Sequence, residues 1–259
     1  MRPGRSDLTP ALNRLKTAGR TALRGLLDLL CPPRCLLCGA FPDRDDGDPA
    51  FCPGCRAGMT PLPEAHCRYC GQPFTTTIPT HHTCALCLEK KPAFEKATAA
   101  GLYEGALRTA IHRLKYEGRT ELARPLAAFM AENLAPPFHP PEADLVLPMP
   151  LHSRRLKKRG FNQALLLAQA LYAPWPGIVR WDLLRRTRPT RPQVGLSEEQ
   201  RKRNVRGAFV VEQPQLLEGR PVILVDDVYT SGATARECAK VLRQAGVDRV
   251  LVLTLARVA

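Results

Sequence analysis

The sequence is short of acidic residues, of aromatic residues and of long hydrophobic runs. Its 259 residues contain 24 Asp and Glu against 38 Lys and Arg, which gives a formal net charge of +14. An apolar stretch such as Ala164 to Ala173 is far too short to cross a bilayer, so we expect no membrane span. Leu23 to Leu30 is interrupted by Arg24 and Asp28, and no small-residue cleavage site follows, unlike a secretory signal. We therefore expect a cytoplasmic protein.

Cysteines are plentiful, and in a reducing compartment ten of them favour metal binding over disulfides. Eight form an internal repeat, in which a C-x2-C pair, a gap of 13 residues and a second C-x2-C pair recur 32 residues later. The first unit consists of Cys35, Cys38, Cys52 and Cys55, and the second of Cys67, Cys70, Cys84 and Cys87. Gly39 and Gly71 follow the second cysteine of each unit, where a tight turn favours glycine.

This repeat predicts two structural zinc ions. A C-x2-C pair brings two thiolates to one ion, and two such pairs complete a tetrahedral site that is closed to water. Sequential pairing within each unit is the simplest arrangement, and interleaved pairing is the alternative. Cys31 and Cys238 lie outside the repeat and are interpreted as ordinary thiols. The nearby histidines are interpreted as bystanders, because four thiolates already fill each site: His66, His81 and His82.

The chain divides by composition into three segments. Residues 1–30 predict an amphipathic helix with leucines at helical spacing, which packs on its own protein or contacts a membrane surface or partner. Residues 31–92 hold the cysteine repeat and are too poor in apolar residues to form a core without metal. Residues 93–259 form the remaining domain, with a helical lead-in over 103–135 and a sheet domain over 143–257.

Strand and helix patterns alternate in the sheet domain. Strands are predicted at Asp144 to Met149, Pro221 to Val225 and Arg249 to Leu255. Helices are predicted at Phe161 to Leu171 and Ala233 to Gln244. This alternation indicates an α/β fold with a doubly wound parallel sheet.

One strand–loop–helix segment combines features that suit a phosphorylated sugar. From Val222 the sequence reads VILVDDVYTSGATA, so a hydrophobic strand ends in two acids and is followed by a loop of small and hydroxyl residues. Ligands collect at the carboxyl ends of parallel strands, and backbone N–H groups at a helix start bind phosphate. Two adjacent carboxylates can accept hydrogen bonds from a pair of ribose hydroxyls.

This segment resembles the phosphoribosyl pyrophosphate signature of type I phosphoribosyltransferases. The resemblance implies that Asp226 and Asp227 are the catalytic acids on the ribose hydroxyls, with Mg²⁺ accompanying the pyrophosphate. It places the 5′-phosphate on Thr230, Ser231, Gly232, Ala233 and Thr234. A non-catalytic phosphate loop is the alternative.

Two basic stretches fit the same family. Leu147 to Asn162 corresponds to the pyrophosphate loop, with His152, Arg154 and Arg155 as candidates. Arg180 to Phe209 resembles the flexible loop that closes over the sugar, and Arg188, Arg191 and Gln193 are its candidate residues.

The order of motifs along the chain narrows the resemblance. A paired C-x2-C module is followed by LKYEGR (114–119), PMPLHSRRLKKRGFNQA, RNVRGAF (203–209) and VDDVYTSGATA, a series similar to the ComF/GntX family over about residues 31–257. That family is associated with natural competence and with the use of external DNA. The resemblance implies phosphoribosyl transfer to an unidentified acceptor. The alternative is a non-catalytic module of the competence machinery that senses phosphoribosyl pyrophosphate, binds single-stranded DNA and contacts competence proteins.

The positive charge is concentrated in one block. Residues 151–210 contain 14 Lys and Arg against 3 Asp and Glu, a net charge of +11. Such a block indicates anionic partners, although a solvated surface would explain most of its arginines taken singly. Few aromatic residues accompany it, so binding of single-stranded DNA is expected to be mainly electrostatic.

Overall fold

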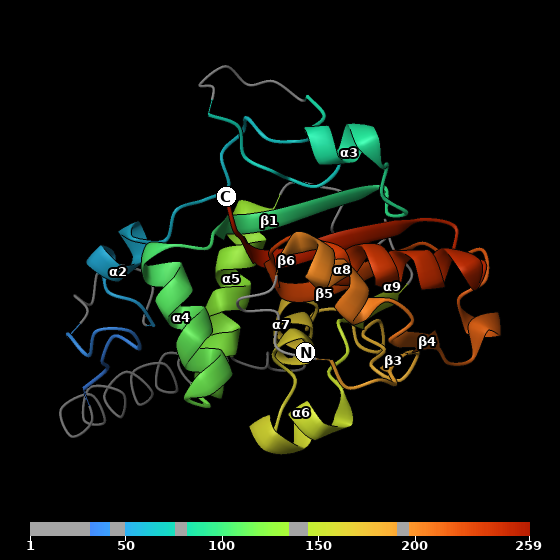
Figure 1. Cartoon of the computed structure of the whole chain (residues 1–259). Coiled ribbons are helices and arrows are strands. Elements are labelled where there is room, and N and C mark those ends of the chain that lie inside the picture. The colour runs from blue at the N-terminus through green and yellow to red at the C-terminus, as the bar shows by residue number, and fades with distance from the viewer. Residues whose placement is uncertain (1–31, 42–49, 76–81, 135–144, 191–196) are drawn as a thin grey trace, which may run out of the picture. The chain divides into compact units, whose positions relative to one another are not determined.

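The computed structural model describes residues 32–41, 50–75, 82–134, 145–190 and 197–259 (Figure 1). The predicted helix over residues 1–30, and Cys31, His81, Arg191 and Gln193, lie outside the described residues. The chain forms two compact units, Met1–Arg56 and Ala57–Ala259. The two cysteine units therefore belong to different compact units, because the second packs into the core of the α/β part.

The first unit surrounds the first set of cysteines with a few buried apolar side chains. Cys35, Leu37 and Phe51 are buried, and the amide of Leu36 donates to the carbonyl oxygen of Ala50. Cys55 lies on the short helix α2 (Pro53–Ala57).

A four-stranded parallel sheet forms the centre of the second unit, with strand order β1-β6-β5-β2. The strands are β1 (Lys96–Leu102), β2 (Leu145–Pro148), β5 (Val222–Tyr229) and β6 (Val250–Arg257). Every residue of β6 is buried, as expected for a strand covered on both faces. The sequence analysis did not identify β1, because KATAAGL has few of the bulky β-branched or aromatic residues typical of strands.

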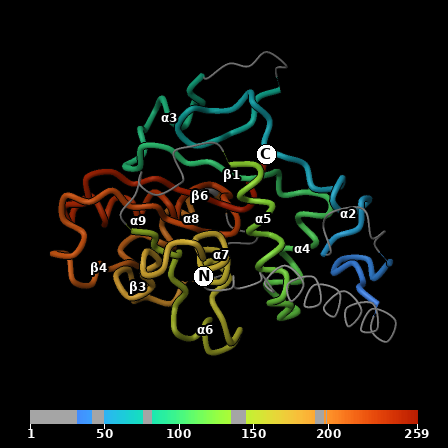
Figure 2. Tube along the Cα trace, turned by 180° about the vertical axis from the view of Figure 1, so that it is seen from behind, coloured from blue at the N-terminus to red at the C-terminus, as the bar shows by residue number. Residues whose placement is uncertain are grey.

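Helices cover both faces of this sheet (Figures 1 and 2). Helices α5 (Ala123–Asn133) and α7 (Gln163–Leu171) pack together against one face, and α9 (Ala233–Gln244) covers the other. Helix α4 (Gly105–Tyr116) follows β1, and the 3-10 turn η1 (Thr120–Leu122) leads into α5. The predicted α/β fold with a doubly wound parallel sheet is therefore confirmed.

Shorter elements complete the unit. Helix α3 (Ala85–Glu89) belongs to the second cysteine unit, and α6 (Ser153–Arg159) follows β2. A two-stranded antiparallel sheet pairs β3 (Leu184–Arg186) with β4 (Phe209–Val211). Between them lies α8 (Glu198–Val205), which begins with a capping box formed by Ser197 and Gln200. The 3-10 turn η2 (Pro214–Leu216) precedes β5.

Most predicted boundaries agree with the structure to within a few residues. The helix predicted at 233–244 has the observed bounds, and the strand predicted at 221–225 extends through the acid pair to Tyr229. In the described part of the chain, no helix has the length and apolar character needed to cross a membrane.

Candidate functional site

The eight repeat cysteines form two separate clusters. In each cluster the four sulfur atoms lie within 4.8 Å of one another, and each cluster takes all four cysteines of one unit, so pairing is sequential. Sulfurs from the two C-x2-C pairs of a unit approach to 3.5 Å between Cys38 and Cys52 and to 3.6 Å between Cys70 and Cys84. Four converging sulfurs fit a closed tetrahedral zinc site, as predicted. Zinc bound there would hold each unit together and take no part in chemistry.

A backbone amide of the second cysteine unit favours the thiolate form of Cys67. The amide of Cys84 donates to Cys67 Sγ at 3.3 Å. The ring of His66 lies with Nδ1 2.7 Å from the carbonyl oxygen of Pro63. Within the described residues, each group close enough to hold a metal ion consists of cysteines alone.

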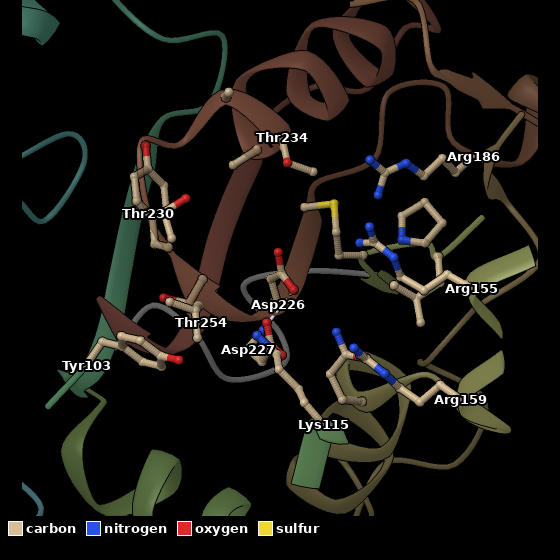
Figure 3. Close-up of a pocket in the computed structure, with 18 of the residues that line it drawn as sticks. Tyr103, Lys115, Arg155, Arg159, Arg186, Asp226, Asp227, Thr230, Thr234 and Thr254 are labelled. Carbon is tan, nitrogen blue, oxygen red and sulfur yellow. Dashed lines mark hydrogen bonds and ion pairs between the residues drawn. The ribbon is translucent and has the colours of Figure 1, made fainter. Parts of the chain in front are cut away.

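The acid pair lies in a cavity of about 720 Å³ at the carboxyl end of β5 (Figure 3). The end of β5 and the start of α9 line one side, and α4 and α6 supply residues from other parts of the chain. Asp226 is half-buried and Asp227 is only 3% exposed. Parallel strands that end at one edge bring these distant segments together.

Lys115, at the end of α4, is paired with the second acid. Its Nζ lies 2.7 Å from Oδ2 of Asp227, and both side chains are largely buried. Burial opposes the charge of Lys115, but the carboxylate of Asp227 raises its pKa above the ordinary value. The motif LKYEGR therefore places a cation in direct contact with Asp227, the second of the two acids.

Asp226 differs from its neighbour because, within the described residues, Lys115 forms its salt bridge with Asp227 and no cation forms one with Asp226. Its Oδ1 accepts a hydrogen bond from the amide of Asp227 at 2.8 Å. Burial and the adjacent charge of Asp227 together raise the pKa of Asp226 to about 8. The first acid is therefore largely protonated at neutral pH until a cation or a ligand favours its ionised form.

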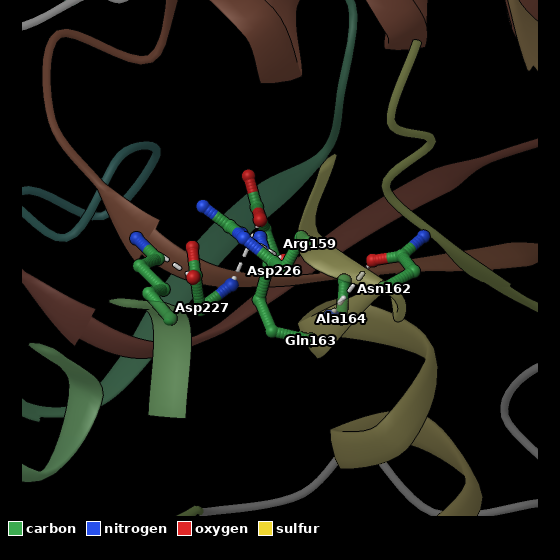
Figure 4. Close-up of polar contacts among 7 residues, drawn as sticks. Arg159, Asn162, Gln163, Ala164, Asp226 and Asp227 are labelled. Carbon is green, nitrogen blue, oxygen red and sulfur yellow. Dashed lines mark hydrogen bonds and ion pairs between the residues drawn. The ribbon is translucent and has the colours of Figure 1, made fainter. Parts of the chain in front are cut away.

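Three arginines lie opposite the acids and form a basic wall of the cavity, namely Arg155, Arg159 and Arg186 (Figure 3). Figure 4 shows Arg159 beside the acid pair, with Nη1 donating to Oε1 of Gln163 at 2.5 Å. Arg186 is 8% exposed, and its Nε makes no hydrogen bond within the described residues. Burial and the charge of Arg155 lower the pKa of Arg186. A site with so many cations, one of them incompletely paired, is suited to a polyanion.

The predicted phosphate loop connects β5 to α9. Gly232 is the N-cap of α9 and has a left-handed φ of 72°. Four of the five predicted residues line the cavity, namely Thr230, Gly232, Ala233 and Thr234. Ser231 is not among the lining residues, and its buried Oγ has no hydrogen-bond partner within the described residues.

The basic residues predicted from the sequence take different places. Arg155 lines the cavity, whereas Arg154 is exposed and is not among the lining residues. His152 caps α6, since its Nδ1 accepts from the amide of Arg154 at 3.2 Å. Arg188 is exposed and donates to the carbonyl oxygens of Asn204 and Arg206 at 3.1 and 2.7 Å.

The cavity residues that were missed from the sequence include three cations near the acid pair, namely Lys115, Arg159 and Arg186. Lys115 and Arg159 lie within the motifs that identified the family resemblance, but those motifs alone did not assign them a role. Arg186 lies in β3 and has no local sequence signal. It lines the cavity although β3 lies far from the acid pair in the sequence.

Comparisons with known proteins match both parts of the chain. A family model described as a double zinc ribbon domain matches residues 26–88. The DNA utilization protein YhgH of Escherichia coli O6:H1 is 37% identical over 199 residues, covering 74% of this chain and 83% of that protein. Competence protein F of Haemophilus influenzae is 34% identical over 80% of this chain and 90% of that protein. Competence protein ComFC of Bacillus subtilis is 24% identical over 82% of this chain and 89% of that protein.

Solved structures give a weaker likeness. One described as the allosteric regulatory enzyme of purine biosynthesis is 26% identical over 51% of this chain and 25% of that chain, with a TM-score of 0.32. Such a low TM-score does not establish a common fold, so the fold assignment rests on the strand order and connections of this chain.

Proposed function

This chain belongs to the ComF family, and on that premise we propose that its α/β unit binds phosphoribosyl pyrophosphate with Mg²⁺ and transfers the phosphoribosyl group to an acceptor. One observation carries the proposal. The acid pair, a loop at the start of α9 and a wall of arginines face one cavity at the carboxyl end of β5. Each of these three features suits a different part of the same ligand.

In this proposal, the loop, the acid pair and the arginine wall each hold one part of the ligand. Backbone N–H groups of residues 230–234 hold the 5′-phosphate, assisted by the positive end of the α9 dipole. Asp226 and Asp227 accept hydrogen bonds from the ribose hydroxyls, and Lys115 forms an ion pair with Asp227. Arg155 and Arg186 attract the pyrophosphate. Mg²⁺ supplies further positive charge to that group, and oxygen ligands of the kind that the acid pair offers are the ones it prefers.

Transfer breaks the bond between the anomeric carbon and the pyrophosphate oxygen, and a bond to the acceptor forms at the same carbon. Positive charge develops on the sugar as pyrophosphate leaves. The two carboxylates are fixed nearby and favour that charge without having to reorganise. The arginine wall favours the negative charge that accumulates on the departing pyrophosphate.

Calorimetry with phosphoribosyl pyrophosphate and Mg²⁺ tests the binding step. We expect Asp226→Asn combined with Asp227→Asn to weaken binding by about 2 kcal/mol or more, because hydrogen bonds to charged groups contribute about 1.5–3 kcal/mol each. The matched control is Asp248→Asn, an exposed acid just before β6 and away from the cavity. Equal affinity in the wild type and the double variant would remove these acids from the site. A separate assay for pyrophosphate release by the wild type distinguishes catalytic turnover from binding alone.

Single-stranded DNA is a second candidate ligand, proposed for the basic helices. Helix α6 has the sequence SRRLKKR, and α8 carries Arg201, Lys202 and Arg203. Both helices also contribute lining residues to the cavity, namely Lys158, Arg159 and Arg201. The relatives named for DNA utilization and competence favour this proposal, which includes competence proteins as partners. On this account the cavity ligand regulates DNA handling and need not turn over.

The salt dependence of DNA binding tests the second candidate. Lys202→Gln combined with Arg203→Gln removes two exposed charges without changing the cavity. The slope of log affinity against log salt should fall by about 0.7 for each lost phosphate contact. Lys240→Gln combined with Arg243→Gln, outside the basic block, is the control. Fluorescence anisotropy with a labelled oligonucleotide gives both slopes, and the absence of binding at low salt would refute a DNA role.

A further inference from the structure

Arg257, the last residue of β6, is a buried cation beside the second cysteine cluster. Its side chain is 4% exposed, and Nη2 lies 3.7 Å from Sγ of Cys70 and 2.6 Å from Oε1 of Gln72. Its Nε and Nη1 make no hydrogen bond within the described residues. A buried guanidinium is unfavourable unless an anion offsets its charge. Thiolates bound to zinc in this cluster would supply that negative charge.

Arg236, on α9, is a second cation on the same cluster. Its Nη2 lies 3.2 Å from Sγ of Cys87, and its Nη1 donates to the carbonyl oxygen of Lys90 at 2.8 Å. Two elements of the α/β unit, β6 and α9, therefore each direct a guanidinium at one of the sulfurs. Three of the four cysteines in this cluster are buried, against one of four in the first cluster.

The charges of this arrangement balance when a divalent ion is bound. Four thiolates and one Zn²⁺ leave two negative charges, which the two guanidinium groups neutralise. Outer partners of this kind orient metal ligands and tune the metal site. Loss of the ion and protonation of the thiols would remove the counter-charge and leave both arginines unfavourably placed.

Arg257 also contacts the residue that precedes the phosphate loop. Its guanidinium carbon lies 4.5 Å from the centre of the Tyr229 ring, a cation–π distance. The two residues are partners in the β5–β6 ladder, and the amide of Val258 donates to the carbonyl oxygen of Tyr229 at 3.0 Å. Tyr229 is 5% exposed, and the edge-on ring of Phe94 packs against it.

The ring of Tyr229 in turn supports the phosphate loop. A Cβ atom added to Gly232 would lie 2.0 Å from Oη of Tyr229, so the tyrosine fills the space directly beside the loop backbone. A continuous path of contacts therefore runs from Cys70 through Arg257 and Tyr229 to Gly232.

We propose that the second cysteine cluster, when it holds zinc, positions the phosphate loop through Arg257 and Tyr229. The metal content of this cluster then determines how tightly the loop holds a phosphate. This inference rests on the proposed function, since it requires that the loop bind a phosphorylated sugar. It goes beyond that function by making Arg257 and Tyr229 positioning residues and by linking the zinc module to the cavity.

Two measurements on the full-length, zinc-loaded chain test the proposal. One is the rate of zinc transfer to the chromogenic chelator 4-(2-pyridylazo)resorcinol, and the other is the affinity for ribose 5-phosphate by calorimetry. Cys38→Ser removes a ligand from the first cluster and so identifies which release phase belongs to the second. We expect Arg257→Gln to speed zinc release from the second cluster and to weaken ribose 5-phosphate binding, each by about tenfold.

Matched variants separate the two ends of the path. Arg236→Gln removes the other guanidinium and should speed zinc release while leaving ribose 5-phosphate affinity within about twofold. Tyr229→Leu should weaken ribose 5-phosphate binding and leave zinc release unchanged, and it carries the test if Arg257→Gln does not fold. Arg257→Lys keeps the charge and should restore most of the zinc retention.

The outcomes distinguish this proposal from the proposed function. If the wild type binds ribose 5-phosphate and both Arg257→Gln and Tyr229→Leu bind it equally well, the coupling is wrong and the phosphate site stands. Unchanged zinc release in both arginine variants would show that the guanidinium groups do not stabilise the cluster. If the wild type binds neither ribose 5-phosphate nor phosphoribosyl pyrophosphate with Mg²⁺, the proposed function is refuted, and the coupling with it.

Discussion

Replacing Lys115 with methionine should destabilise the protein in a pH-dependent way. The substitution keeps the length and apolar character of the side chain but leaves the carboxylate of Asp227, which is 3% exposed, without its partner at 2.7 Å. Removing one partner of a buried pair costs about 3–5 kcal/mol. Both residues of the pair line the cavity, so we expect the lower end, about 3 kcal/mol of unfolding free energy.

The sign of the pH dependence follows from the acids. Without Lys115, the two adjacent carboxyl groups repel each other more strongly, and the pKa of Asp226, already raised to about 8, should rise further. Protonation relieves the repulsion, so the loss of stability should be largest above pH 8 and should shrink as the pH falls toward 6. Urea denaturation of the zinc-loaded wild type and variant at pH 6 and above pH 8 measures how the loss of stability changes with pH.

A control and a double-mutant cycle make the test specific. Lys158→Met removes an exposed cation from the cavity rim and should change stability by no more than about 0.5 kcal/mol. Once Asp227→Asn has removed the charge, Lys115→Met should cost much less than it does in the wild type. A loss below about 1 kcal/mol, independent of pH, would show that the pair does not stabilise the fold.

Three further predictions follow from the site. The pKa of Asp226 is raised to about 8, and its ionised form accepts hydrogen bonds from the ribose hydroxyls. Affinity for phosphoribosyl pyrophosphate should therefore increase between pH 7 and pH 9, and protons should be released on binding. Calorimetry in buffers of different ionisation enthalpy measures this release, and a flat pH profile without proton release would contradict the prediction. Gly232→Ala should lose about 2 kcal/mol more stability than Gly207→Ala. Both glycines have a left-handed φ, but only a Cβ atom at position 232 would collide with the Tyr229 ring. Equal losses in urea denaturation would argue against that contact. Asn162→Ala should lose about 1–2 kcal/mol in thermal denaturation, because its Oδ1 caps α7 and its Nδ2 donates to a backbone carbonyl; an unchanged melting temperature would show that neither bond matters.

The sequence predicts those features that depend on local pattern. The cysteine spacing indicated both clusters, and the alternation of strands and helices indicated the parallel sheet. Helix α9 was predicted with its observed bounds because a glycine precedes it and its apolar residues recur at helical spacing. Sequential pairing of the cysteines was the simplest arrangement from the sequence, and the structure confirms it.

Features that depend on contacts between distant segments were not predicted. Lys115 meets Asp227 across 112 positions of sequence, and Arg257 meets Cys70 across 187. Nothing local distinguishes either cation from a solvated surface charge. The first strand, β1, was missed for a different reason, since its small residues form a strand through pairing with β6 and packing against α5. Tertiary packing determined these features.

The most direct test of the central claim is the electron density of phosphoribosyl pyrophosphate bound with Mg²⁺. We predict that the 5′-phosphate oxygens lie within hydrogen-bond distance of the backbone N–H groups of residues 230–234, that the ribose hydroxyls face Asp226 and Asp227, and that the pyrophosphate faces Arg155 and Arg186. A ligand bound elsewhere at saturating concentration, or one whose phosphates contact neither the loop nor the arginines, would contradict the account.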